Sequence, residues 1–533
     1  MSQERLDRIK KMEQIRLFGV VPYASKFDKK DTIWFLLSKQ WNKFRDIEDI
    51  ISWPQYDYKT AGRMTLYRTH GKLSFAKLLD ESGEIQLIFH RDYCNIVIDW
   101  KDVDILVSWD QEISAYKFIE KLVDIWDWLG VEGELFHTHK WELTLFVSRF
   151  TLLSKAIRPL GDKFHGVWDN QETAYRQRYL DMIHNRETID RMKLRSQFIK
   201  TLREFYWKEW FIELDTPILW NSASGAAAKP FVTHHDDYDL DVFLRIAPEI
   251  ALKMATVWWL ERVFEIWKDF RNEWSDPSHH QEFLVAEHYA LYWNYEDNIR
   301  FTEDMFNYLF DNMPQLSRTI KVADKSWNIK EVTFGRKREK IDYIDRIKSD
   351  SGIDVSIYSP EDEQTLRDLI KSKWYNWDWL DKQTTATMID YLYKKVTRPK
   401  ILGPAFIYNY PKTMQPLART SDNNPHVVEQ FQAIINWREI LKAYSELVDP
   451  VELQSNFDAQ AEALARGDDE ATKSDDEFVI SMEYGMAPQS WWGMWLDRIL
   501  AMLTEQSNVR DVIMFPLMKP LNNHSDIGED DIW

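Results

Sequence analysis

The sequence predicts an α+β protein that begins with a small β-barrel. From Ala61 to about residue 155, short runs such as "KLSFAKLLD" and "EIQLIFH" have the composition of strands and are separated by polar turns. Five strands in about 100 residues are typical of a barrel of the OB type. The amphipathic helix "RMKLRSQFIKTLREFYWKEW" follows, and strand and helix patterns then alternate, as expected of an α+β chain.

The same patterns divide the chain into segments. The first residues are charged and helical in pattern, and a connector leads from the barrel to the amphipathic helix. We therefore expect an N-terminal helical extension at 1–60, the OB-fold domain at 61–160, a connector at 161–185, a main domain at 186–525 with a charged helical insertion at about 315–400, and a tail at 526–533.

Composition excludes several classes of protein. The formal net charge of −19 argues against indiscriminate nucleic-acid binding, although the first 80 residues are basic overall and could hold RNA locally. The single Cys94 excludes a disulfide framework and a cysteine zinc site. No run of 18 uncharged apolar residues and no apolar signal core are present, so we expect a cytoplasmic protein without a membrane partner.

Arginines and carboxylates stand out as candidate functional residues. The chain has no P-loop, HExxH or GxSxG motif. Arg271 in "FRNE" and Arg498 in "LDR" offer planar donors for phosphate or carboxylate. Glu439 can hold Mg²⁺ against phosphates, and Phe283 can stack on a base. Each residue taken singly belongs more often to a surface ion pair or to the core, so their order along the chain matters.

That order resembles class II lysyl-tRNA synthetases along nearly the whole chain. The matching stretches are "RYLDMI", "LDTPIL", "GAAAKPFVTHH", "LRIAPEIALK", "LERVFEI", "FRNE", "AYSEL", "MEYGM" and "VRDVIMFPLMKP". The resemblance implies an OB-fold that reads the anticodon and a catalytic domain with an antiparallel sheet flanked by helices. "LDTPIL" with Pro217 is similar to motif 1 at the dimer interface, "FRNE" to motif 2, and "LDR" to the end of motif 3.

The resemblance implies a lysine–tRNA ligase that works in two steps. ATP and L-lysine give lysyl-adenylate and pyrophosphate, and the 3′-terminal adenosine of tRNA(Lys) then takes the lysyl group. Neither step needs a protein nucleophile, because positioning and charge stabilisation carry the rate. The implied cofactor is Mg²⁺ with ATP, and the implied assembly is a homodimer.

The resemblance also assigns roles residue by residue. Arg271 and Arg498 are the expected catalytic residues. ATP binding is assigned to Arg271, Glu273, His279, Phe283, Glu439 and Arg498. Lysine binding is assigned to Glu249, Arg271, Glu287, Tyr289, Tyr444 and Glu446. Metal binding is assigned to Glu439 and Gln432, and anticodon binding to Phe75, Gln86 and Glu142.

Some positions depart from the family pattern. Gln432 stands where many members have a second metal-binding acid, and Lys442 stands where asparagine is usual. More systematically, tryptophan replaces a family glycine at Trp141, Trp210, Trp258, Trp259, Trp267, Trp274, Trp437, Trp491 and Trp495. The chain holds 16 glycines and 26 tryptophans in 533 residues, whereas glycine alone usually makes up about 7% of a protein.

One replacement repeated so often suggests a rule. Our hypothesis is that a codon read as glycine in the source organism, with UGA as the candidate, is translated here as tryptophan. Codons of UGG at Trp491 and Trp495 would refute it. Glycine serves positions of positive φ or close backbone approach, and an indole there would crowd an ATP site.

Two alternatives to a lysine–tRNA ligase remain. One is a lysine-activating paralogue that modifies a protein, although such relatives generally lack the barrel expected here. The other is a non-catalytic tRNA-binding protein, if the tryptophans at glycine positions are real.

Overall fold

The computed structural model describes residues 2–109, 111–160, 170–221, 225, 228–257, 259–324, 327–358, 362–373, 380, 383–415, 417–465 and 476–520. The chain divides into two compact units, one made of Met1–Asp169 with Pro520–Trp533 and the other of Asn170–Lys519. The predicted tail at 526–533, residues 161–169 of the predicted connector, and Trp258 lie outside the described residues.

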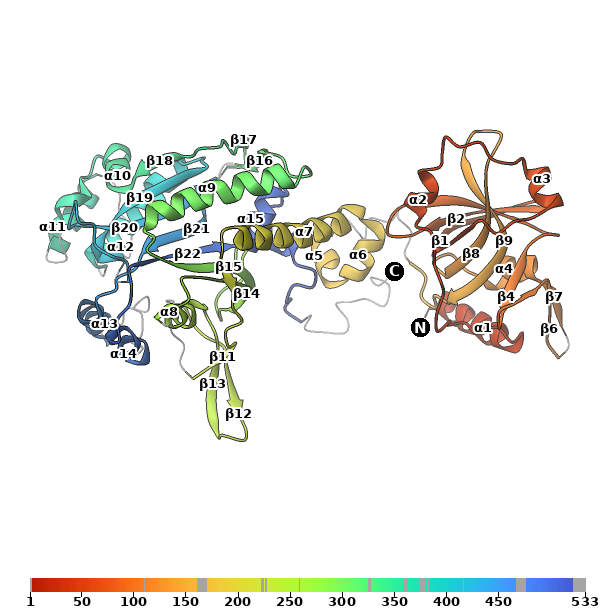
Figure 1. The fold of residues 1–533 in the computed structure, drawn as a ribbon, viewed down its shortest axis with the longest axis horizontal. Helices are drawn as coiled ribbons and strands as arrows, with labels where there is room; N and C mark the ends of the chain where they lie inside the picture. Colours follow the sequence, from red (N-terminus) through yellow and green to blue (C-terminus); the bar gives the residue numbers. More distant parts are fainter. Residues whose placement is uncertain are drawn as a thin grey trace. The chain divides into compact units, whose positions relative to one another are not determined.

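The first unit is a β-barrel with short helices around it (Figure 1). Its helices are α1 (Gln3–Leu17), α2 (Ile33–Leu37), α3 (Ile47–Ser52) and α4 (Ala115–Leu122). Its strands are β1 (Tyr58–His70), β2 (Leu73–Leu79), β3 (Glu84–His90), β4 (Asn95–Ile98), β5 (Lys101–Val103), β6 (Ile105–Val107), β7 (Glu112–Ser114), β8 (Trp128–His137) and β9 (Leu143–Ser154).

Five of these strands close on themselves. The sheet order is β3-β2-β1-β8-β9, and β9 also pairs with β3 in parallel, while β4 and β5 extend from β9. Apolar side chains such as Leu87, Leu145 and Phe150 fill the interior. Gly133 lies at a bulge of β8, where a Cβ would meet the Phe146 carbonyl oxygen at 1.8 Å, so only glycine fits. The predicted small barrel is confirmed.

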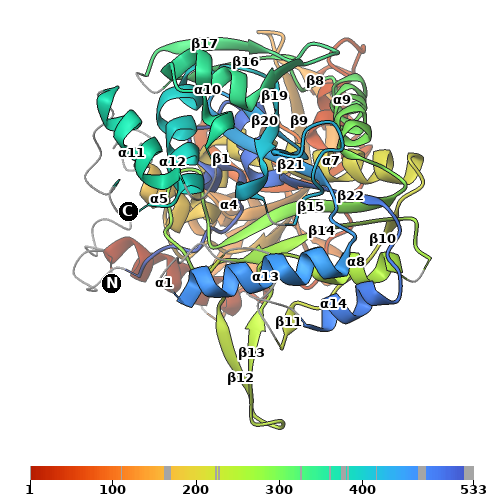
Figure 2. The ribbon, with the colours of Figure 1, turned by 90° about the vertical axis from the view of Figure 1, so that its left-hand side faces the viewer.

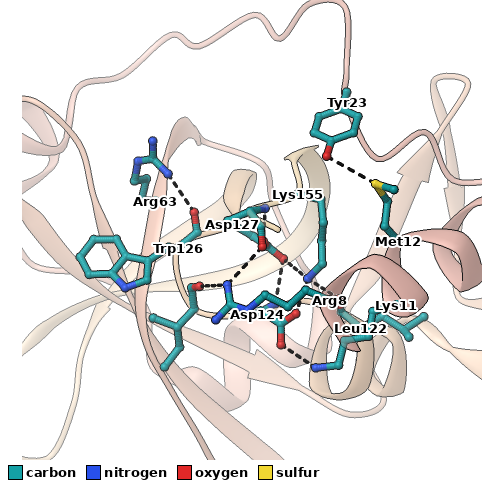
Figure 3. Close-up of polar contacts among 12 residues, drawn as sticks. Arg8, Lys11, Met12, Tyr23, Arg63, Leu122, Asp124, Trp126, Asp127 and Lys155 are labelled. Carbon is teal, nitrogen blue, oxygen red and sulfur yellow. Dashed lines mark hydrogen bonds and ion pairs between the residues drawn. The ribbon is translucent and has the colours of Figure 1, made fainter. Parts of the chain in front are cut away.

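A buried ion cluster ties α1 to the barrel (Figure 3). The Lys155 ammonium is fully buried and lies 2.5 Å from Asp124 and 2.8 Å from Asp127. Lys11 of α1 reaches Asp124 at 2.5 Å, and Arg8 donates to the Ile125 and Ala156 carbonyls. Burial raises the pKa of Asp127, whereas the Lys155 and Lys11 ammonium groups hold the pKa of Asp124 below its usual range.

The second unit is built on an eight-stranded sheet. Its strands run in the order β10 (Ile212–Glu213), β14 (Arg262–Phe270), β15 (Glu282–Leu291), β22 (Gln489–Trp495), β21 (Arg438–Ser445), β20 (Val427–Ile435), β19 (Ala405–Pro411) and β18 (Glu339–Asp342). The inner strands are antiparallel, and the two edge pairs are parallel. The predicted α+β class is confirmed.

One face of this sheet is covered by three helices (Figures 1 and 2). The helices are α7 (Arg186–Lys208), α9 (Tyr295–Asn312) and α15 (Leu496–Leu503). Their apolar side chains, among them Phe205 and Phe306, pack against Ala286, Trp492 and Met494 of the strands. This side of the sheet holds the main core, and on the opposite side a second apolar cluster, which includes Ile407, Val428 and Tyr444, packs against β19, β20 and β21.

The opposite face is bordered by shorter elements. They are α8 (Glu249–Val257), α13 (Pro450–Ala465) and α14 (Asp476–Glu483), with α8 contacting β14 and β15. A small sheet of β11 (Leu219–Trp220), β13 (Leu240–Leu244) and β12 (Val232–His235) ends in a projecting hairpin (Figures 1 and 2). Before α7 lie α5 (Gln171–Arg176) and α6 (Arg178–His184).

The segment expected as a helical insertion at about 315–400 begins with strands. β16 (Thr319–Ala323) and β17 (Ile329–Thr333) form a hairpin that buries Ile320, Val322 and Val332. In β16 the buried Ile320 and Val322 flank the exposed Lys321, and this period is that of a strand rather than a helix. After β18 come α10 (Tyr343–Ser351), α11 (Glu363–Ser372) and α12 (Thr385–Leu392). Within the described residues, no helix is both long and apolar enough to cross a membrane.

Candidate functional site

The strand register gathers most of the predicted site residues on the face away from the main core. Side chains alternate along a strand, so every second residue of β15, β22 and β21 points to the same side. Across these strands Tyr289, Trp491 and Tyr444 lie in one row, and Glu287, Gly493, Lys442 and Gln432 lie in the next. Phe283 and Trp495 lie on the same face further along. The residues between them, such as Trp492, point into the core.

A cluster of buried acidic side chains, called the acidic pocket below, lies at one end of this face. Glu249 begins α8 and Glu446 follows β21, and both carboxylates are buried. The Lys253 ammonium lies between them, 2.7 Å from Glu249 and 3.1 Å from Glu446. The Tyr444 hydroxyl donates to Glu249 at 3.0 Å. Glu287 supplies a third buried carboxylate, which accepts a hydrogen bond from the Trp491 indole at 3.0 Å.

Burial raises the pKa values of Glu287 and Glu446. Burial, with Asp269 and Glu249 nearby, raises the pKa of Glu287 well above its usual value. Burial raises the pKa of Glu446 to about 7, against the opposing effect of Lys253. Desolvated carboxylates gain from a cation, so the pocket is suited to an ammonium group brought in from solution.

Sequence analysis missed Lys253, which completes the pocket. Lys253 is 1% exposed, and its pKa lies above the usual value because Glu249 and Glu446 outweigh the effect of burial. Its position four residues after Glu249 in "EIALK" was the available signal, since such residues share a helix face.

Two arginines and two aromatic rings form the neighbouring part of the site. The Trp495 indole stacks on Phe283, with ring centroids 4.7 Å apart and planes 11° apart. The Arg498 guanidinium covers the same indole at 4.1 Å, and the Arg271 guanidinium lies 5.4 Å from it. The Nε2 atom of His279 accepts a hydrogen bond from the Arg498 guanidinium at 3.1 Å. Arg271, His279, Phe283 and Arg498 are thus brought together.

Arg498 is fixed from both sides. One of its nitrogens donates to the Glu439 carbonyl oxygen at 2.5 Å. The preceding Asp497 is paired with Arg195 of α7 and accepts from the Leu284 backbone N–H at 2.7 Å. Burial lowers the pKa of Arg498 to about 10, so its guanidinium still carries its charge at neutral pH. Glu273, by contrast, is exposed beyond the end of β14.

A buried ion network that the sequence did not reveal lies on the same face, on the neighbouring strand β14. Arg245 lies 2.8 Å from Glu265 and 3.2 Å from Asp269, and all three are nearly inaccessible. Thr216 of "LDTPIL" donates to Glu265 at 2.7 Å. Burial raises the pKa of Asp269 to about 7. The network holds the "LDTPIL" segment against β14, and Glu265 and Asp269 lie directly across from Glu287 and Phe283 on the same face.

The candidate metal ligands lie apart from any acidic cluster. Glu439 stands on β21 beside Arg498, and the Gln432 amide oxygen accepts from the Tyr410 hydroxyl at 2.8 Å. Lys442, paired opposite Gln432, donates to Gln415 at 2.8 Å, and burial lowers its pKa. Among the described residues, no three His, Cys, Asp or Glu side chains are grouped to hold an ion. Glu439 therefore offers one carboxylate, which suits Mg²⁺ that arrives on phosphates.

The three anticodon candidates lie on one side of the barrel. Phe75 of β2 and Gln86 of β3 are near neighbours in the register of these strands. The Gln86 amide donates to Thr144 at 2.9 Å, and the Thr144 hydroxyl donates to the Glu142 carbonyl oxygen. Phe75 is only partly buried, so its ring has a free part that can stack on a base.

Comparisons with known proteins agree with this arrangement. Residues 170–519 match the tRNA synthetases class II (D, K and N), and residues 58–153 match an OB-fold nucleic acid binding domain. A lysine–tRNA ligase from Carboxydothermus hydrogenoformans is 34% identical over 514 residues, covering 96% of this chain and 97% of the relative.

Further relatives give the same result. A lysine–tRNA ligase from Lactiplantibacillus plantarum is 35% identical and covers 98% of both chains. Another, from Aquifex aeolicus, is 37% identical and covers 87% of this chain and 75% of the relative. The chain belongs to the class II tRNA synthetase family, in the group that includes the lysine–tRNA ligases.

Proposed function

We propose that this chain is a lysine–tRNA ligase. The observation that carries the proposal is the position of the acidic pocket, which adjoins the Arg271–Phe283–Arg498 cluster on the same face of one sheet. The acidic pocket suits the ammonium groups of a basic amino acid. The Arg271–Phe283–Arg498 cluster suits a nucleoside triphosphate. A substrate that spans both would place its carboxylate beside the arginines.

Recognition of lysine rests on charge and length. Glu249, Glu287 and Glu446 supply three carboxylates, of which Lys253 neutralises part. A substrate with two ammonium groups restores the balance, whereas an apolar amino acid would leave the buried carboxylates unpaired. Tyr289 and Tyr444 line the same pocket and can position the aliphatic part of the substrate.

Activation of lysine needs no protein nucleophile. A lysine carboxylate oxygen attacks the α-phosphorus of ATP while the bond to the pyrophosphate oxygen breaks, so lysyl-adenylate and pyrophosphate form. Arg271 would hold the carboxylate and the α-phosphate together, and Arg498 and Phe283 would hold adenine between them. Glu273 would contact the adenine edge, and His279 the outer phosphates. These planar donors stabilise the charge that builds up on the phosphate.

Mg²⁺ bound to the phosphates would neutralise charge on the leaving pyrophosphate. Glu439 is the residue that would hold it, with Gln432 as a weaker oxygen ligand. Tyr410 already occupies one lone pair of the Gln432 amide oxygen. We therefore expect a Mg²⁺ requirement that depends mainly on Glu439 and on the nucleotide.

The partners we propose are tRNA(Lys) and a second copy of this chain. Phe75 would stack on a splayed anticodon base, and Gln86 and Glu142 would offer hydrogen bonds to its edge. The "LDTPIL" segment with Pro217 would form the dimer interface, as in the family. Light scattering of the purified protein at micromolar concentration tests the homodimer, and a mass of one chain would refute it.

The direct test is lysine-dependent ATP–pyrophosphate exchange, followed by charging of tRNA(Lys). Because Trp491 and Trp495 lie within the site, the assay uses the variant W491G/W495G beside the unchanged chain. R271A in the same background is the control and should abolish exchange. Exchange supported by another amino acid but not by lysine would refute the proposal. Exchange without charging of tRNA would favour a paralogue that modifies a protein.

A second candidate function is favoured by the tryptophans themselves. If both indoles are native, the catalytic face is filled while the barrel keeps its candidate RNA face. The protein would then bind tRNA without turning over ATP. Tight tRNA binding by W491G/W495G with no exchange would support this candidate.

A further inference from the structure

We infer that the functional form of this protein carries glycine at positions 491 and 495, and that the two indoles otherwise plug the amino-acid and adenine subsites. The inference rests on the proposed function for the identity of the two subsites. Its basis is the backbone conformation of tryptophans throughout the chain and the positions of these two side chains.

Tryptophan occupies backbone conformations that suit glycine. Thirteen non-glycine residues among those described have positive φ, and seven of them are tryptophan, although tryptophan makes up only 26 of 533 residues. The seven are Trp100 (66°), Trp126 (81°), Trp141 (61°), Trp210 (64°), Trp259 (87°), Trp327 (64°) and Trp437 (57°). Bulky residues adopt this region rarely, because their Cβ clashes with the backbone.

Most of these tryptophan side chains are exposed, so burial of the indole does not offset the cost of the positive φ. Trp210 is 83% exposed, Trp259 88% and Trp327 82%. A large apolar side chain stabilises a fold only when it leaves water, so these indoles add strain with little gain. Glycine accepts the same φ without strain. Trp141, Trp210, Trp259 and Trp437 are among the positions where family glycines are replaced, so sequence and conformation agree independently.

Trp495 occupies the place proposed for adenine. Its indole is a flat double ring, with the Phe283 ring nearly parallel to it at 4.7 Å and the Arg498 guanidinium over it at 4.1 Å. The His279 ring meets its edge at a centroid distance of 5.8 Å. A phenyl ring and a guanidinium that sandwich a flat heterocycle form a purine site. With the indole against both groups, the surfaces of Phe283 and Arg498 that would hold adenine are already covered.

Trp491 fills the amino-acid subsite in a similar way. Its indole nitrogen donates to Glu287, one of the carboxylates proposed to hold a substrate ammonium. Its ring lies 4.9 Å from Tyr444 and so close to Gly493 that a Cβ there would meet it at 2.6 Å. The indole therefore takes both the volume and a hydrogen-bond acceptor that lysine would use.

Trp492 shows how a tryptophan that belongs to the fold behaves. It is fully buried in the main core, stacks on His288 at 5.0 Å, and donates to the Thr302 hydroxyl at 2.8 Å. Its neighbours 491, 493 and 495 point to the other face, where a row of glycines would leave an open floor for two substrates. Because side chains alternate along β22, Trp492 points into the core, whereas Trp491 and Trp495 point to the proposed substrate face.

Binding of ATP and lysine tests the plugs. Calorimetry with Mg–ATP and, separately, with L-lysine compares the unchanged chain, W491G/W495G and the matched control W141G/W210G, which replaces two tryptophans outside the site. We expect binding only in W491G/W495G, with pyrophosphate exchange raised at least 100-fold. Equal binding by all three proteins, or no binding of either ligand by W491G/W495G, would overturn the inference. If W491G/W495G binds ATP but not lysine, the plug at 495 stands and the proposed substrate fails.

The backbone argument has a test that does not depend on function. At Trp210, glycine should be more stabilising than alanine, because only glycine relieves a positive φ. At Trp34, 66% exposed within α2, alanine should be better than glycine. We expect opposite signs for the two glycine-minus-alanine differences in melting temperature, each about 1–3 °C. The same sign at both positions would overturn the glycine assignment.

The natural protein gives the decisive comparison. Peptides of the protein purified from its source organism should have masses that correspond to glycine at positions 491 and 495, and the gene should read UGA there. Tryptophan masses at these two positions would refute the inference directly.

Discussion

Replacement of Lys253 by methionine isolates the charge balance of the acidic pocket. The ammonium is 1% exposed and pairs with two carboxylates that are 6% and 2% exposed, at 2.7 and 3.1 Å. K253M keeps the volume of the side chain but leaves Glu249 and Glu446 facing each other, with the Tyr444 hydroxyl as remaining donor to Glu249. Removing one member of a buried ion pair costs about 3–5 kcal/mol, so we expect a loss of that size in the free energy of unfolding.

The loss in the free energy of unfolding of K253M should depend on pH and on the concentration of free L-lysine. Without Lys253 the pKa of Glu446 should rise further above its usual value, because the opposing effect of the ammonium is lost, and the destabilisation falls on the ionised form of this carboxylate. The destabilisation should therefore be larger at pH 8 than at pH 6. In the W491G/W495G background, L-lysine at 100 times its Kd should restore about 2.7 kcal/mol. An ammonium group of the bound L-lysine would take the place of the missing Lys253 ammonium.

Urea unfolding followed by circular dichroism measures the loss, and hydrogen exchange of α8 amides assigns it to the pocket. K412M is the matched control, because Lys412 pairs with Glu452 at 2.9 Å but both side chains are more than a third exposed. Its loss should stay below about 1 kcal/mol. The idea that Lys253 balances the buried carboxylates would be refuted if K253M lost no more free energy of unfolding than K412M. It would also be refuted if L-lysine did not restore the stability of K253M.

The other predictions concern the remaining charges and the barrel. K155M should destabilise the barrel by about 3–5 kcal/mol, seen as faster hydrogen exchange in β8 and β9, because Asp127 loses its buried partner; unchanged exchange would contradict this. In W491G/W495G, the KM for lysine should fall as pH rises from 6 to 8, since Glu446, with its pKa raised to about 7, must be ionised to bind a cation; a flat profile would exclude its role. K442N in the same background should lower that KM about tenfold by removing a cation from the pocket, as exchange kinetics would show. F75A should weaken tRNA(Lys) binding by about 1–3 kcal/mol in filter binding without altering pyrophosphate exchange, and a parallel loss of exchange would indicate misfolding instead.

The sequence by itself determined the class of the molecule. Short alternating runs predicted the barrel, and ordered motifs identified the residues that the sheet register later places on one face. Period-2 alternation is local, so it is readable from the letters alone. The same analysis missed the β16–β17 hairpin, because charged residues on its exposed side masked the alternation of Ile320 and Val322.

Only the tertiary structure decided what each side chain contacts. Lys253 and Glu446 are far apart in the sequence, and their pairing requires α8 to pack beside the end of β21. The two kinds of tryptophan in "SWWGMWLDR" look alike as letters. The fold separates them, since Trp492 enters the core while Trp495 packs against Phe283 and Arg498 on the other face. Long-range packing sets these contacts, and a positive φ becomes visible only once the backbone is placed.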